Sequence, residues 1–235
     1  MCESTSGGLS WLAGGPEKKK SKYVDVCTFN STGRPQLMDA LNHCRRGRFT
    51  GPRCSDVDVP VAACLNQEHH ARGDEWVDLK MSARKAGWNL VGAMAEPSKG
   101  SQGKAGAAIA TRTAFHTGFT KGAAEDMFSE ESPGRVATVW VDGIVRGGIL
   151  IISIYLYDGE GLTTRNRAIL FAAGEIIRRH GGPWVIGGDF NCVPQDIHEE
   201  MADWLKELGG ELRAPGNLTC RSANGGRTID FFILD

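Results

Sequence analysis

Short apolar runs alternate with amphipathic stretches along the chain, and each pattern predicts a type of element. Apolar or alternating runs bounded by turn residues predict strands at 23–29, 57–65, 88–93, 107–111, 136–141, 149–156 and 228–234, and at the run that starts at Trp184. Apolar residues at helical spacing predict helices at 35–44, 71–86, 163–180 and 196–208. Strand pairs thus stand between helices, which favours a mixed-sheet α/β protein over a strict βαβ repeat.

The remaining segments set the limits of the domain. Residues 1–22 are rich in Ser, Gly and Lys, which predicts a disordered leader followed by one domain at 23–235. Residues 112–134 mix Gly, acids and a Pro, which indicates a long surface excursion. With 235 residues and 41% hydrophobic content, the chain is long enough to bury one large core.

The charge balance restricts the binding surfaces. The formal net charge is -1, so the protein has no global basic field and any contact with nucleic acid requires a local patch. One candidate patch is the loop that carries Arg45, Arg46, Arg48 and Arg53. Arg112 follows a predicted strand, where it is expected either to bind phosphate or to lie in solvent.

The seven cysteines include no Cys-x-x-Cys pair, so a thiolate zinc site has little support. Cys27 and Cys64 lie in apolar runs and are expected to be buried structural thiols. An odd cysteine count without a signal peptide favours a reducing, intracellular compartment, either nucleus or cytoplasm. No apolar run approaches the length of a bilayer, so we expect no membrane partner.

Polar side chains stand where the predicted strands end. Asp189 and Asn191 follow two glycines and are two residues apart, so in an extended segment they point to the same side. They suit metal and phosphate chemistry, or else form an Asx-rich turn. Glu68 offers a hard oxygen ligand for Mg²⁺. Asn30 is expected to share that metal or to bind phosphate, and Tyr155 either donates to a phosphate oxygen or packs in the core.

Several motifs occur in the order found in one known family. They are Thr28-Phe29-Asn30, Gln67-Glu68-His69-His70, residues 103–109, Ser153-Ile154-Tyr155, Gly188-Asp189-Phe190-Asn191, Leu218-Thr219 and residues 228–233. With these motifs the chain resembles the endonuclease/exonuclease/phosphatase superfamily, in particular abasic-site endonucleases and the endonuclease domains of non-LTR retrotransposons. The resemblance implies a deoxyribonuclease-like, four-layered sandwich of two mixed β-sheets flanked by helices.

The resemblance also implies roles for the residues around one cleft. Asn30 and Glu68 would line a site for Mg²⁺, with Mn²⁺ as a substitute. Asn30, Thr219 and Tyr155 would contact the scissile phosphate. Asp189 would orient or deprotonate the attacking water, and Asn191 would assist it. Asp230 would hold a catalytic histidine. His70 is expected to be a structural part of the site wall.

The sequence departs from the family pattern at its C-terminal end. A Ser-Asp-His motif follows the last strand in the family, whereas this sequence ends at Asp235 and His69, His70, His116, His180 and His198 all lie upstream. We therefore expect a C-terminally incomplete domain in which Asp230 is wet, protonated or paired with a donor such as Arg227. Residues 1–235 alone are expected to nick DNA little or not at all. Two smaller departures are Tyr157, where proline is usual, and Ser153, where asparagine is common.

The function expected from the resemblance is Mg²⁺-dependent phosphodiester hydrolysis by a retroelement-type DNA endonuclease. DNA is the expected partner, and a longer protein would fuse the domain to a reverse transcriptase. Two alternatives stand beside it. One is a phosphatase for small molecules or inositol phosphates, and the other is an inactive remnant or nucleic-acid-binding module without the catalytic histidine. A flat basic surface favours DNA, and a closed pocket favours the small molecule.

Overall fold

The computed structural model describes residues 7–10, 25–31, 33–45, 61–98, 103–118, 134–222 and 225–235. These residues build two mixed sheets and a small hairpin. The strands of the five-stranded sheet are, in spatial order, β1 (Gly7–Ser10), β2 (Asp25–Asn30), β3 (Val61–Gln67), β5 (Ala108–Arg112) and β4 (Trp88–Gly92). The strands of the six-stranded sheet are β10 (Glu211–Arg213), β13 (Asp230–Leu234), β9 (Trp184–Asp189), β8 (Ile149–Tyr155), β7 (Val136–Val141) and β6 (Thr117–Gly118). The hairpin consists of β11 (Cys220–Ser222) and β12 (Gly225–Arg227).

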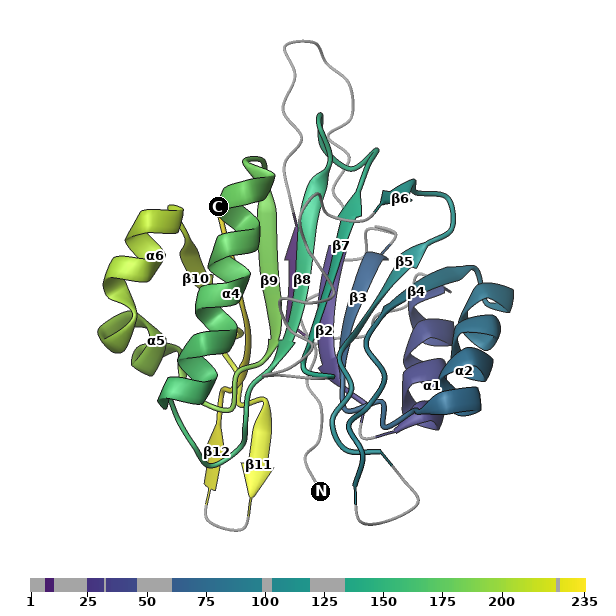
Figure 1. The fold of residues 1–235 in the computed structure, drawn as a ribbon, viewed down its shortest axis with the longest axis horizontal. Helices are drawn as coiled ribbons and strands as arrows, with labels where there is room; N and C mark the ends of the chain where they lie inside the picture. The colour runs from purple at the N-terminus through teal and green to yellow at the C-terminus, as the bar shows by residue number, and fades with distance from the viewer. Residues whose placement is uncertain are drawn as a thin grey trace.

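Helices cover the outer face of each sheet, so the molecule has four layers (Figure 1). The first sheet is covered by α1 (Arg34–Arg45) and α2 (Gly73–Lys85). The second sheet is covered by α4 (Thr164–His180), α5 (Pro194–Glu200) and α6 (Ala202–Leu208). This arrangement confirms the expected four-layered sandwich. In the described part of the chain, no helix combines the length and the apolar character needed to span a bilayer.

Burial on both faces explains why the central strands have continuous apolar sequences. In β8 every residue is buried. Ile152 and Ile154 face α4, whereas Ile149 and Ile151 face the first sheet, as the two-residue period of a strand requires. Leu65 of β3 contributes to the same layer between the sheets. The core between the two sheets therefore fixes how their strand ends meet.

Several elements differ from the expected ones. The helix expected over 196–208 is two helices that meet at Met201, whose φ of -124° interrupts the helical path. The break lets the buried residues Ile197, Trp204 and Leu205 reach the same core. Short strands at β10, β11 and β12 were not expected, because three residues carry too little periodicity.

The segments expected to be irregular contain short strands. Within the expected leader, residues 7–10 pair antiparallel with β2, so these four residues are extended rather than disordered. Residues 1–6 and 11–24 lie outside the described residues. The excursion expected at 112–134 contains β6, and its residues 119–133 also lie outside the described part.

We predict that Gly188→Ala destabilises the fold by about 3 kcal/mol, because the new methyl group overpacks a backbone contact. A Cβ at Gly188 would lie 1.9 Å from the carbonyl oxygen of Ile154 on the neighbouring strand. Gly209→Ala is the control: Gly209 has φ +67° but nothing within 4 Å of its Cβ position, so only backbone strain of about 1 kcal/mol is expected. Urea unfolding measures both values. Equal losses in the two variants would contradict the close-approach argument.

Candidate functional site

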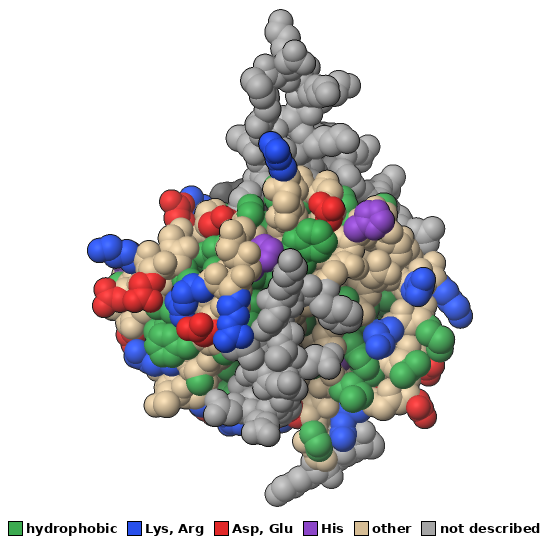
Figure 2. All heavy atoms as spheres, turned by 45° about the horizontal axis from the view of Figure 1, so that its top comes forward, with side chains coloured by type: hydrophobic (Ala, Val, Ile, Leu, Met, Phe, Trp, Pro, Cys, Tyr) green, Lys and Arg blue, Asp and Glu red, His purple; other side chains and the backbone are tan. Residues whose placement is uncertain are grey.

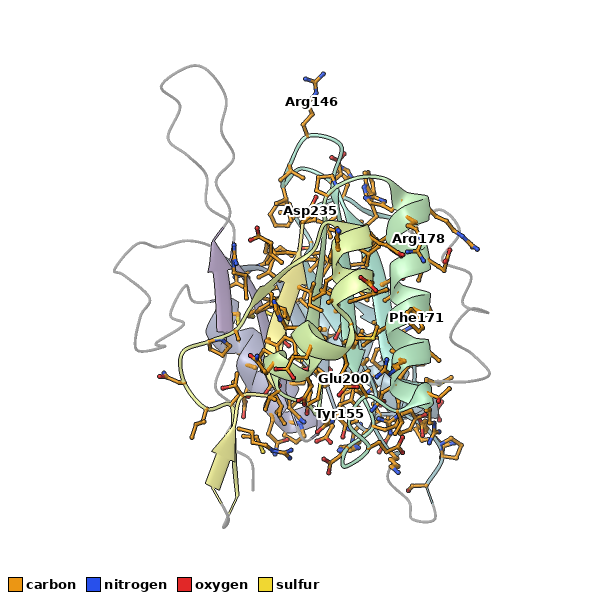
Figure 3. The ribbon with its side chains drawn as sticks, turned by 90° about the vertical axis from the view of Figure 1, so that its left-hand side faces the viewer. Arg146, Tyr155, Phe171, Arg178, Glu200 and Asp235 are labelled. Carbon is orange, nitrogen blue, oxygen red and sulfur yellow. The ribbon has the colours of Figure 1, made fainter. Side chains whose placement is uncertain are left out.

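Strand pairing brings the ends of five strands to one end of the sandwich. β2 and β3 run parallel, so Asn30 pairs with Gln67, next to Glu68. β8 and β9 also run parallel, so Tyr155 pairs with Asp189. The antiparallel strand β13 begins here and places Asp230 opposite Asp189. In Figure 3 Tyr155 lies at the end of the molecule away from Asp235 and Arg146.

Hydrogen bonds between side chains join the two sheets at this end. The Nδ2 of Asn30, on the first sheet, donates to Asp189 Oδ2 at 3.3 Å. The Tyr155 hydroxyl, on the second sheet, donates to Oε1 of Glu68. Deeper between the sheets, Gln67 Nε2 donates to Ser153 Oγ at 2.9 Å. The structure therefore brings Asn30, Glu68, Tyr155 and Asp189 together, and Tyr155 belongs to the site rather than only to the core.

The turn after β9 orients the Asp189 carboxylate. The backbone N–H of Asn191 donates to Asp189 Oδ1 at 2.9 Å, which is an Asx-turn bond. Asn191 has φ +49°, and its Nδ2 donates to the Leu156 carbonyl at 2.8 Å. Asp189 and Asn191 thus form an Asx turn that is itself part of the site. Asn191 holds the carboxylate through its backbone and anchors the turn with its side chain.

A sharp bend in the chain turns Glu68 away from β3. Glu68 and His70 have φ +62° and +56°, which is the left-handed region that L-residues rarely adopt. Between them, His69 is buried, stacks on Trp76 and accepts a bond from the Ala71 N–H at its Nδ1. Burial lowers the pKa of His69 to about 4, so its ring is neutral at pH 7. His69 therefore supports the bend rather than titrating in the site.

The structural role expected for His70 is confirmed. Its Nδ1 lies 3.0 Å from the Gly103 carbonyl oxygen, which fixes Nδ1 as the protonated donor. The ring thus ties the chain after Glu68 to the segment that precedes β5. His70 is part of the wall of the site.

Asp189 and Asp230 form a buried pair of carboxyl groups. Burial raises the pKa of Asp189 well above its usual range, and the neighbouring Asp230 charge raises it further. Burial also raises the pKa of Asp230, to about 6; a hydrogen bond from Thr219 opposes the shift and the charge on Glu68 adds to it. Asp230 Oδ1 is buried and has no hydrogen-bond partner among the described residues. Of the states expected for Asp230, the raised pKa favours the protonated one, and one carboxyl oxygen has no partner among the described residues.

Thr219 organises the start of β13. Its buried Oγ1 accepts hydrogen bonds from the backbone N–H groups of Ile229 at 2.9 Å and Asp230 at 3.0 Å. Thr219 thus sits beneath Asp230 and holds its backbone. Contact of Thr219 with a phosphate stays a prediction.

The site offers oxygen ligands that suit a divalent cation. Burial raises the pKa values of both aspartates and the charge on Glu68 adds to both shifts, so a bound cation would offset negative charge here. The described residues contain one trio of acidic, His or Cys side chains with ligand atoms within 4.8 Å of one another, and it lies elsewhere. The three carboxylates are therefore spread more widely.

Comparison with known proteins agrees with this geometry. The profile of the Endonuclease/Exonuclease/phosphatase family matches residues 63–235. The chain belongs to the endonuclease/exonuclease/phosphatase family. The matched residues include every site residue named above except Asn30, which is joined to the site by its bond to Asp189. A search among curated proteins found no match.

Solved structures of similar fold include nucleases and a phosphatase. The endonuclease domain of TRAS1, a telomere-specific non-LTR retrotransposon, is 17% identical, with a TM-score of 0.55 over 88% of this chain and 82% of the other. The AP endonuclease LMAP from Leishmania major is 14% identical, with a TM-score of 0.57 over 89% and 78%. ANGEL2, a 2',3'-cyclic phosphatase, is 12% identical, with a TM-score of 0.52 over 89% and 82%. At these identities the similarity establishes the fold alone.

Arg135 is a buried arginine that was not expected from the sequence, and it holds Tyr155 in place. The Arg135 side chain is 2% exposed and forms an ion pair with Glu96 at 3.0 Å. Its Nη1 donates to the carbonyls of Tyr155 and Leu156 at 3.4 Å. Its guanidinium also lies over the Tyr155 and Tyr157 rings, 4.8 and 3.6 Å from their centroids. The only signal in the sequence was an arginine directly before an apolar strand, and that position did not indicate burial.

Arg112 was also singled out in the sequence, and its side chain has a structural role. Arg112 is neither a phosphate ligand nor a solvated end: its Nε and Nη2 donate to the carbonyls of Val61 and Cys44, and its guanidinium lies over Trp88. It ties β5 to β3 and α1. Of the basic loop, Arg46, Arg48 and Arg53 and the side chain of Arg45 lie outside the described residues.

We predict that Arg135→Met lowers the free energy of unfolding by about 3 kcal/mol, because it leaves Glu96 and two buried carbonyls without their donor. Arg165→Met is the matched control. Arg165 also lies over Tyr157, at 3.4 Å, but its side chain is 53% exposed, so a loss below about 1 kcal/mol is expected. Urea denaturation followed by circular dichroism compares the two. A larger loss for Arg165→Met would show that stacking on Tyr157, not the buried bonds, is what matters.

We predict that Asp230→Asn stabilises the fold by about 2 kcal/mol at pH 8 and has little effect near pH 4. The pKa of Asp230 is raised in the folded state to about 6, so the folded state binds the proton more tightly than the unfolded state. Wild-type stability should therefore fall as the pH rises from about 4 to 6, and the variant should lack this component. Chemical denaturation across pH 4–8 measures it, with the exposed Asp203→Asn as control. A variant less stable than wild type at pH 8 would contradict the prediction.

Proposed function

We propose that this chain supplies the metal-binding core of a Mg²⁺-dependent phosphodiesterase that cleaves DNA, of the retroelement endonuclease type, with Mn²⁺ as a substitute ion. The observation that carries the proposal is the buried Asp189 carboxyl, which is oriented by Asn30 and Asn191 and stands opposite Asp230. A carboxyl of raised pKa in this position is suited to take a proton from water.

Each side chain in the site has a distinct part in this proposal. Asp189 would accept the proton of the attacking water, since Asn30 and the Asn191 N–H fix both of its oxygens. Burial, followed by the hydrogen bond to Glu68, raises the pKa of Tyr155, so its hydroxyl stays protonated and can donate to a phosphate oxygen. Arg135 would act through Tyr155 by fixing the backbone on which that residue stands.

Glu68 and Asn30 are the residues that would hold the cation. When bound, Mg²⁺ neutralises the charge that develops on the phosphate and stabilises the leaving oxygen. Glu68 lies at the bend after β3, half-buried and beside Tyr155, so its carboxylate faces both the site and the bonded hydroxyl.

The solved structures of similar fold support DNA as the substrate. They include an endonuclease domain of a telomere-specific non-LTR retrotransposon and an AP endonuclease. Figure 2 turns the end opposite the site partly toward the viewer, and the acidic, basic and apolar side chains described there are interspersed, with neither charge prevailing.

Specific observations favour each of the other candidates as well. ANGEL2, a 2',3'-cyclic phosphatase, has a similar fold, which supports activity on a small phosphate ester. The unpartnered Oδ1 of Asp230 supports a nucleic-acid-binding module without hydrolysis, because no described histidine bonds to it. The cleavage experiment below separates the three.

The test is nicking of supercoiled plasmid in Mg²⁺. We expect slow or no nicking by residues 1–235, and faster nicking when a family-type segment carrying Ser-Asp-His is appended. Asp189→Ala in the extended chain should lower the rate about 10²–10⁴-fold, the usual contribution of a general base. The exposed Asp78→Ala on α2 should leave the rate unchanged.

Other results would select another function. Cleavage of the plasmid that survives Asp189→Ala would contradict the assigned base. Hydrolysis of small phosphate esters without nicking would favour the phosphatase, and plasmid binding without hydrolysis even by the extended chain would favour the binding module.

A further inference from the structure

Three cysteine thiols meet between the first sheet and α1, away from the site around Asp189. Cys27 lies on β2, Cys64 on β3 and Cys44 in the last turn of α1. The Cys64 sulfur lies 3.2 Å from that of Cys27 and 3.5 Å from that of Cys44. Among the described residues this is the one trio of potential metal ligands within 4.8 Å of one another.

Strand register and helix packing create the trio. Cys27 and Cys64 are partners on parallel strands, so their side chains lie on the same face of the sheet. That face packs against α1 and α2, and Leu37 and Leu41 of α1 bring Cys44 down onto it. The three cysteines are 2%, 0% and 0% exposed, so the cluster lies in an apolar, closed layer.

A fixed positive charge stands beside the cluster. The Arg112 guanidinium donates to the Cys44 carbonyl at 2.6 Å and to the Val61 carbonyl at 3.1 Å. It is held in place over the Trp88 ring, 4.1 Å from its centroid. The guanidinium therefore lies next to the backbone that carries Cys44. Burial raises the pKa of the Cys64 thiol, so this thiol is neutral when no metal is bound.

We propose that Cys27, Cys44 and Cys64 form a binding site for one soft, monovalent metal ion, Cu(I), held by three sulfurs. Thiolates select soft ions such as Cu(I) over hard ones. Closed structural zinc sites take four protein ligands, whereas the described residues supply three here.

Metal binding at this site exchanges thiol protons for the metal ion. Each ligating thiol releases its proton to solvent, and a metal–sulfur bond replaces the S–H bond without any change of oxidation state. Three sulfurs about 2.3 Å from one ion would stand about 4 Å apart. The two sulfur–sulfur distances of 3.2 and 3.5 Å must therefore widen by roughly 0.8 and 0.5 Å when the ion enters.

The experiment is an anaerobic titration of the chain with Cu(I) in competition with bicinchoninate. One version of the chain replaces Cys2, Cys54, Cys192 and Cys220 by Ser and keeps the trio. Its counterpart keeps those four and carries Cys27→Ala, Cys44→Ala and Cys64→Ala. We expect one equivalent bound to the first version and none to the second, and copper K-edge absorption that shows three sulfur ligands.

A third version keeps the proposal testable even if the triple variant misfolds. With only Cys44→Ala added to the trio-retaining chain, the sulfur count should fall to two and the affinity at least tenfold, while circular dichroism stays unchanged. Equal copper binding by the trio-retaining chain and its counterpart would overturn the proposal. So would a disulfide between Cys27 and Cys64 in place of the metal, or tighter binding of Zn²⁺ than of Cu(I).

Discussion

The register of β13 against β9 sets Asp230 opposite Asp189 inside the protein. The hydrogen bonds around the two residues depend on that placement. Side chains directly opposite each other in an antiparallel pair lie about 5 Å apart, so two buried carboxyl groups here cannot both be charged at low cost. Burial raises the pKa values of both, and the charge on Asp230 raises that of Asp189 further. Asn30, the Asn191 N–H and Thr219 supply the hydrogen bonds that keep this pair in the folded state.

The two sheets are connected at the same place. Asn30 and Glu68 come from the first sheet, and Asp189 and Tyr155 come from the second, so each half of the site depends on the packing between the sheets. The layer between the sheets is apolar and closely filled, and it leaves the strand ends little freedom to slide. The buried Arg135 extends this rigidity to the segment after β8. Such an arrangement keeps polar groups in fixed positions, which is what electrostatic catalysis requires.

Most helices and strands could be predicted from the sequence, because burial of one or both faces sets the spacing of the apolar residues. β8 and β9 are buried throughout and largely apolar because both of their faces are covered, and α4 has a clear apolar stripe that ends at Gly181 in the left-handed conformation. The polar residues at the strand ends could be found because they interrupt these patterns. The register itself, which sets Asp230 against Asp189, has no such signature, and only the family resemblance indicated that the two would meet.

Features that depend on contacts distant in sequence were missed. The ion pair of Arg135 with Glu96 spans 39 residues, and the Cys44–Cys64 contact spans 20. The structural role of Arg112 depends on carbonyls of α1 and β3 that lie far upstream. A single sequence shows the type of each residue but not its partner, so a buried arginine looks like any other arginine before a strand.

The central proposal is that a divalent cation binds beside the buried carboxyl groups of Asp189 and Asp230, whose pKa values burial raises. It is tested most directly by a ¹³C NMR titration of the aspartate carboxyl groups, with and without Mg²⁺. The account predicts a pKa of about 6 for Asp230 without the ion and a clear decrease when Mg²⁺ is added, with a smaller decrease in Glu68→Gln. An Asp230 pKa near that of an exposed aspartate, or one that Mg²⁺ leaves unchanged, would contradict it.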